Sequence, residues 1–135
     1  MYKLINFFIL LFLLLFNSAQ SNNKIIRFAF CLEAKGDVIR KGLARNGNLL
    51  KGDVIYENDK IIVGENSYVS FLNTFERSEV RLFENSSIKI LKSNKQSDYD
   101  ELIHEIVIFG GKVIIDKIEL NDKSLIIHSP SSSVF

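Results

Sequence analysis

The chain has 135 residues, of which 47% are hydrophobic, and it carries 17 Lys and Arg against 16 Asp and Glu. This near balance of charge argues against proteins that bind nucleic acid or anionic membranes through many phosphate contacts. The apolar content, with a single proline, argues against a disordered chain. The length suits one domain.

The N-terminus has the three regions of a secretory signal peptide. Lys3 supplies the positive charge, residues 4–16 form an apolar run, and a short stretch with small residues at Ala19 and Ser21 follows. At about 1.5 Å per residue the run spans roughly 20 Å, less than the roughly 30 Å hydrocarbon core of a membrane. We predict cleavage after Ser21, with cleavage after Ala19 as the alternative. Residues 22–135 are then an exported domain, periplasmic or extracellular, whose only membrane contact is during export.

A period of two dominates the rest of the chain. Short runs rich in Val, Ile, Phe and Tyr alternate with turn residues about every ten residues, which is typical of strands. In chain order, strands are predicted at 24–33, 36–40, 49–56, 60–63, 67–72, 78–83, 88–92, 102–109, 112–118 and 124–128. No helical run is long enough for a βαβ crossover. The prediction is a single all-β domain of short strands, packed as a sandwich, a barrel or a β-roll.

The segments between the strands are polar or rich in glycine. Residues 46–48 and 93–101 are predicted to be loops, and residues 73–77 a polar tip. Gly110 and Gly111 separate two apolar runs, which predicts a type I′ hairpin in which both glycines have positive φ.

The residues able to carry chemistry are scattered. His104 and His128 lie in separate strand patterns with no Cys or second His nearby, so we expect surface or cross-strand histidines rather than metal ligands. Cys31, the only cysteine, alternates with larger apolar residues and is expected to be a small buried hydrophobe.

No nucleophile elbow, phosphate loop or dinucleotide fingerprint is present in the sequence. We therefore predict no catalytic, cofactor-binding or metal-binding residue and no enzyme. The carboxylates expected to be solvated are Asp37, Asp53, Asp59, Glu84 and Asp116.

Several short motifs follow one another along residues 34–135. In chain order they are Gly36-x-Val38, Leu50-x-Gly52-Asp53-x-Ile55, Asn58-Asp59-x-Ile61, Ser67-Tyr68-Val69-Ser70-Phe71, Val80-x-Leu82-x-x-Asn85-Ser86-x-Ile88-x-Ile90, Gly111-x-Val113 and Ile127-His128-Ser129-Pro130. This ordered set resembles the FecR domain family, the periplasmic domain of iron-dicitrate sensor regulators.

The polar and glycine residues of these motifs suit corners between strands, because glycine permits positive φ and Asp or Asn can accept backbone amides. They are expected to be structural, and none is carried over as a catalytic or ligand-binding residue. These corner residues are Gly36, Gly52, Asp53, Asp59, Asn85, Ser86, Gly110 and Gly111.

The resemblance implies an exported, non-enzymatic interaction module of the cell envelope, which contacts another envelope protein or a cell-wall glycan and needs no cofactor. The alternatives are a periplasmic sensor in sigma-factor and anti-sigma signalling, and an accessory domain of an exported enzyme. Signalling members of the family have a membrane span before the domain, whereas this chain has a signal peptide. The family also has an Asp-Gly-Ser turn where this chain has Phe75-Glu76-Arg77-Ser78. Because the family runs on beyond the position of Phe135, we predict a C-terminally truncated domain without its last strand.

Overall fold

The computed structural model describes residues 1–7, 9, 24–95, 102–118 and 125–129. Residues 2–7 are helical. Within the described ranges, no helix has the length and apolar character needed to cross a membrane. Two predictions concern residues outside the described ranges: cleavage after Ala19 or Ser21, and the C-terminal truncation, which depends on residues 130–135.

The strands are β1 (Arg27–Lys35), β2 (Val38–Lys41), β3 (Asn46–Asn48), β4 (Val54–Tyr56), β5 (Lys60–Val63), β6 (Tyr68–Asn73), β7 (Ser78–Leu82), β8 (Ser87–Ile90), β9 (Asn94–Lys95), β10 (Leu102–Gly110), β11 (Val113–Lys117) and β12 (Leu125–His128).

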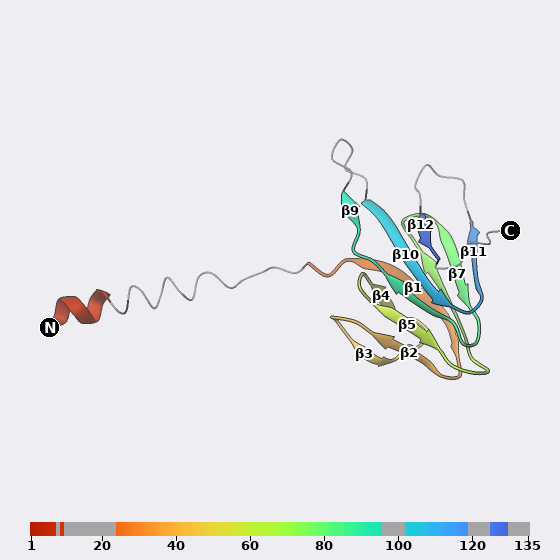
Figure 1. Cartoon of the computed structure of the whole chain (residues 1–135), viewed down its shortest axis with the longest axis horizontal. Helices are drawn as coiled ribbons and strands as arrows, with labels where there is room; N and C mark the ends of the chain where they lie inside the picture. Colours follow the sequence, from red (N-terminus) through yellow and green to blue (C-terminus); the bar gives the residue numbers. More distant parts are fainter. Residues whose placement is uncertain (8, 10–23, 96–101, 119–124, 130–135) are drawn as a thin grey trace.

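These strands form two sheets that pack against each other (Figure 1), so the prediction of an all-β domain is confirmed. The first sheet has five strands in the order β11-β7-β6-β1-β4. The second has the order β12-β10-β8-β5-β2-β3, with β9 paired to β10 beside this path. The chain passes repeatedly from one sheet to the other, which makes the fold a sandwich. The pair β10–β12 is parallel because β11, which separates the two in the chain, belongs to the other sheet.

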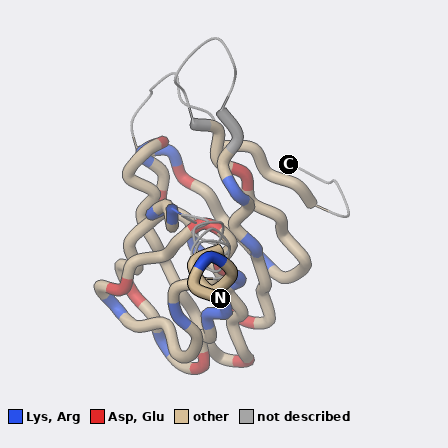
Figure 2. Tube along the Cα trace, turned by 90° about the vertical axis from the view of Figure 1, so that its left-hand side faces the viewer, with Lys and Arg blue, Asp and Glu red and all other residues tan. Residues whose placement is uncertain are grey.

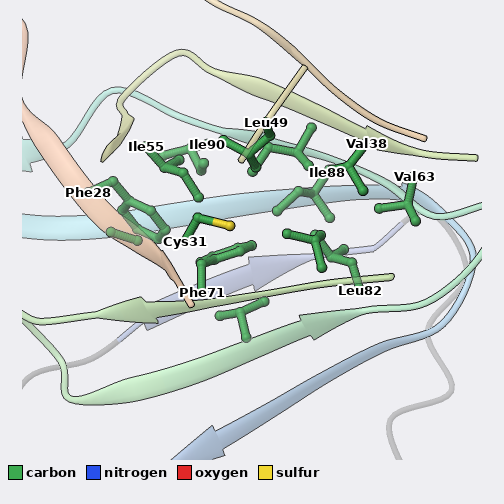
Figure 3. Packing of buried hydrophobic residues seen from close by; sticks show 14 of the residues in the cluster. Phe28, Cys31, Val38, Leu49, Ile55, Val63, Phe71, Leu82, Ile88 and Ile90 are labelled. Atoms are coloured by element: carbon green, nitrogen blue, oxygen red, sulfur yellow. The ribbon is translucent and has the colours of Figure 1, made fainter. Parts of the chain in front are cut away.

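The core lies between the sheets and is built from the inward positions of both. Phe28 and Phe71 of the first sheet meet with their ring centroids 6.3 Å apart in an edge-to-face arrangement, and Ile88 of the second sheet lies in the same cluster (Figure 3). Burial of one such side chain contributes about 1.5–3 kcal/mol to stability. Cys31 is part of this cluster at 3% exposure, as predicted, and burial raises the pKa of its thiol from 9.0 to about 11.

The predicted loop at residues 46–48 is wrong, because these residues form β3. The sequence Asn-Gly-Asn has no apolar side chain to signal a strand, but its backbone pairs with β2 in the register Ile39↔Asn48 and Lys41↔Asn46. All three residues are exposed, so this edge strand is held by backbone pairing and by Oδ1 of Asn46, which accepts the Gly42 amide at 2.9 Å. Within the predicted loop at 93–101, β9 forms a short pair with β10, and residues 96–101 lie outside the described residues.

The predicted hairpin at Gly110 and Gly111 is also wrong. β10 belongs to the second sheet and β11 to the first, so the two glycines carry the chain between sheets. Only Gly111 has a positive φ, of 86°. Its close neighbour is Ser86, whose hydroxyl donates to the Lys112 carbonyl and accepts from the Lys112 amide, each at 3.0 Å. The crossover is thereby attached to the corner between β7 and β8.

Candidate functional site

The outward face of the second sheet carries three lysines on three neighbouring strands. Their neighbours in the chain, Arg40, Ile61 and Ile88, point into the core and are at most 2% exposed. Because successive side chains of a strand point to opposite faces, the lysines point to solvent. We call this set the lysine row: Lys41 of β2, Lys60 of β5 and Lys89 of β8.

The strand register places the three lysines directly opposite one another. Lys41 pairs with Lys60 across β2 and β5, and Lys60 pairs with Lys89 across β5 and β8. Directly opposed residues have Cβ atoms about 4.5–5.5 Å apart, and like charges in such pairs are destabilising. The row therefore concentrates three positive charges at a cost to the stability of the sheet.

No carboxylate compensates the lysine row within the described residues. The ion pairs found there involve other cations: Lys35, Arg40, Arg45, Arg81, His104 and His128. On the same face, Glu105 of β10 lies 2.7 Å from Nε2 of His128 through its Oε2 atom. Along the described part of the trace, Lys and Arg are interspersed with Asp and Glu (Figure 2). The lysine row is thus a local concentration of charge in a chain whose net charge is +1.

Apolar side chains border the lysine row on the same face. Ile39 and Ile62 are opposed across β2 and β5 and are half-buried. Phe109 at the end of β10 is 52% exposed, and Nζ of Lys60 lies 4.8 Å from the centroid of its ring. The face therefore offers both ammonium groups and an accessible aromatic ring.

A second charged cluster is internal and joins the two sheets. Nη1 of Arg40, from β2, donates to the carbonyl of Val54 in β4. Nη2 of Arg40 lies 3.7 Å from Oδ2 of Asp53, and its Nη1 lies 3.9 Å from Oδ2 of Asp59. Arg40 and Asp59 are 2% and 0% exposed. A buried guanidinium without a nearby carboxylate is strongly destabilising, so Asp53 and Asp59 offset the cost of burying Arg40.

Asp59 was expected to be solvated at a corner between strands, but its side chain is buried. Its Oδ2 accepts the Tyr56 amide at 2.9 Å, which is the backbone contact expected at a corner. The carboxylate lies under Gly42, where a Cβ atom would overlap it. Burial raises the pKa of Asp59 above 3.8, against the lowering effects of the Tyr56 amide and Arg40. The prediction of a solvated Asp59 is therefore wrong.

His104 is buried, at 2% exposure, so of the two expectations for it, a surface or a cross-strand histidine, the surface one is wrong. Its Nδ1 lies 2.6 Å from Oε1 of Glu76, and its Nε2 lies 3.9 Å from Oε1 of Glu57. The rings of Phe28 and Phe75 meet the imidazole edge-on, at centroid distances of 5.3 and 4.9 Å. Within the described part of the chain no serine or cysteine is hydrogen-bonded to His104. The cluster there lacks the nucleophile of a catalytic triad.

A pocket of about 260 Å³ opens on the outer side of Glu57. Glu57 is 5% exposed, and its Oε1 accepts the Ser93 amide at 3.0 Å. His104 does not line this pocket, whereas Glu57, whose Oε1 lies 3.9 Å from Nε2 of His104, does. The lining residues are Lys24, Ile25, Ile26, Leu43, Glu57, Asn58 and Lys92.

The other predicted corner residues lie apart from the lysine row. Gly36 and Gly52 have φ values of 75° and 88°, and Asn85 has 58°. Asp53 accepts the Leu50 amide at 3.0 Å. Ser86 binds the backbone of Lys112, as described above. Asp53 and Asp59 share Arg40, and Ser86 lies against Gly111, but the structure does not bring the eight corner residues together at one site.

For some of these buried charged residues, the sequence does contain a signal of burial. Arg40 and His104 occupy inward positions of their strand patterns, in register with Val38 and Ile106 respectively, so the period of two implied burial for both. Glu57 and Glu76 lie in turns and had no such signal. The lysine row had none either, since its three members belong to separate strands whose register is a tertiary property.

Comparison of the chain with models of protein families, with curated proteins and with solved structures found no match. In residues 24–95, 102–118 and 125–129, no three His, Cys, Asp or Glu side chains are placed to hold a metal ion. The lysine row and the ring of Phe109 together form an accessible charged and aromatic surface on the second sheet.

Proposed function

We propose that this chain is an exported, non-enzymatic interaction module of the cell envelope that binds another envelope protein or a wall polymer. The outward face of the second sheet makes the contact. Export is inferred from Lys3 and the apolar run at residues 4–16. The resemblance to FecR domains gives the same class of function.

The observation that carries the proposal is the uncompensated lysine row. Opposed like charges destabilise a sheet, and the ion pairs of the described residues leave all three lysines out. A partner with negative charge on this face relieves the repulsion between the lysines. The half-buried Ile39 and Ile62 and the exposed Phe109 add apolar contact area beside the charges.

The test is co-sedimentation of the purified protein with bacterial cell-envelope fractions, separated into membranes and insoluble wall. We expect binding to one fraction, and we expect it to be lost when Lys41, Lys60 and Lys89 are all replaced by Gln. The control replaces Lys35, Lys51 and Lys92 by Gln, which removes the same charge from exposed positions elsewhere. Absence of binding by the unmodified protein, or equal loss in both triple variants, refutes the proposal.

A further inference from the structure

We propose that the lysine row binds a linear acidic polysaccharide, one that carries a carboxylate on its sugar rings. This inference rests on the proposed function and specifies the partner of the same face. It is drawn from the spacing of the lysines, from the shape of the surface around them and from the position of Phe109.

The lysine row runs across the strands, not along one of them. Adjacent strands lie about 4.8 Å apart, so the three lysine stems start from positions that span about 10 Å in a line. The consecutive pairs Lys41↔Lys60 and Lys60↔Lys89 define this line. Lysine stems are flexible and their ammonium groups act as point charges, so they can adjust to carboxylates that recur along an extended chain.

The row lies on an open sheet face. Three pockets of the described part of the structure are lined by other residues. A single small anion would meet only one or two ammonium groups there and would remain largely hydrated. A polymer engages all three at once and releases several counterions together, which is the main source of affinity in polyanion binding.

Phe109 distinguishes a sugar polymer from other polyanions. Its ring is 52% exposed, and the ammonium of Lys60 lies 4.8 Å from its centroid. Sugar rings have apolar C–H faces that pack on exposed aromatic rings and remove apolar surface from water. A sugar that carries a carboxylate can therefore meet the ring and the ammonium together. A polypeptide of acidic side chains lacks such a rigid apolar face.

The charge distribution on the rest of this face agrees with an anionic partner. Among the described outward positions of β2, β5, β8, β10 and β12, the acidic side chain is Glu105, which is paired with His128. The backbone carbonyl of Glu105 accepts the Leu91 amide at the end of β8 at 2.9 Å, and Glu105 is a diagonal neighbour of Lys89, whose direct partner in β10 is Val107. Among the described residues, the outward positions of β2, β5 and β8 themselves carry no carboxylate.

The experiment measures binding of the purified protein to polygalacturonate by isothermal titration calorimetry at several salt concentrations. The comparison polymers are dextran, which is neutral, and poly-glutamate, which is acidic without sugar rings. We expect binding to polygalacturonate, no binding to dextran and at least tenfold weaker binding to poly-glutamate. Single-stranded nucleic acids release about 0.7 counterions for each charge that a protein neutralises. With the same value for polygalacturonate, replacing the three lysines by Gln should reduce the steepness of log affinity against log salt concentration by about 2.

A Phe109→Ala variant distinguishes the contribution of the aromatic ring to affinity from the contribution of the lysine charges. We expect it to lose severalfold in affinity for polygalacturonate while it keeps the salt slope and the weaker affinity for poly-glutamate. The triple variant at Lys35, Lys51 and Lys92 should bind like the unmodified protein. A circular dichroism melt of each variant verifies that it is folded before its affinity is interpreted.

Three results would overturn the inference: no binding to polygalacturonate, equal affinity for poly-glutamate, or tighter binding to phosphatidylglycerol vesicles than to the polysaccharide. These outcomes are distinct from failure of the proposed function. If wall or membrane fractions still bind through the lysine row while polygalacturonate does not, the interaction module stands and only the polysaccharide is wrong.

Discussion

Replacement of Gly111 by alanine should destabilise the protein strongly, whereas the same change at Gly110 should not. Gly111 has a φ of 86°, and an L-residue in the left-handed region costs roughly 1–2 kcal/mol. A Cβ atom at this position would also lie 2.7 Å from Cβ of Ser86 and closer still to its Cα, so the Ser86 backbone has to move. Such overpacking typically costs about 1–3 kcal/mol. We expect Gly111→Ala to lower the free energy of unfolding by roughly 2–5 kcal/mol, since the two costs add.

Gly110 is the matched control, because it has no positive φ and a Cβ atom there would have nothing within 4 Å. Gly110→Ala should be neutral, or should stabilise by about 0.4–1 kcal/mol through the loss of freedom in the unfolded chain. Urea denaturation followed by circular dichroism measures both variants, with the m-value used to verify that the unfolding transition is unchanged in character. Equal destabilisation by the two substitutions would mean that the glycines form the hairpin predicted from the sequence, and would refute the crossover.

Three further predictions concern charge and burial. Arg40→Ala leaves Asp59 buried without its cation and should cost about 3–5 kcal/mol in the same urea assay; a loss below 1 kcal/mol would show that the internal cluster is not needed. Joint replacement of Lys41 and Lys89 by Gln should raise stability by about 0.4–1 kcal/mol, because opposed like charges destabilise a sheet, and the gain should vanish in 1 M salt, where screening is nearly complete. The Cys31 thiol, with its pKa raised to about 11 by burial, should react with iodoacetamide far more slowly at pH 8 than in the urea-unfolded chain. Since the folded state disfavours the thiolate, stability should also fall as the pH rises from 9 towards 11; fast alkylation of the folded protein would contradict both statements.

The fold class and the positions of most strands could be predicted from the amino-acid sequence alone. Alternation of apolar and polar residues is a local property, so the buried faces of β6 and β8 and the burial of Cys31 could be predicted. The exceptions were β3 and β9, neither of which contains an apolar side chain. Strands of this kind pair mainly through their backbones, so side-chain periodicity does not reveal them.

Which strands share a sheet could be seen only in the tertiary structure. The position of the lysine row depends on this pairing of strands. The same glycine pair is compatible with a hairpin or a crossover, and the close approach of Ser86 to Gly111 is a contact between residues far apart in the chain. Likewise, the pattern around Lys60 shows that its side chain faces outward, but not that Lys41 and Lys89 stand on either side of it. Register depends on which strands pair and in which offset. For this reason the lysine row is a property of the folded protein and has no counterpart in the sequence read along one strand.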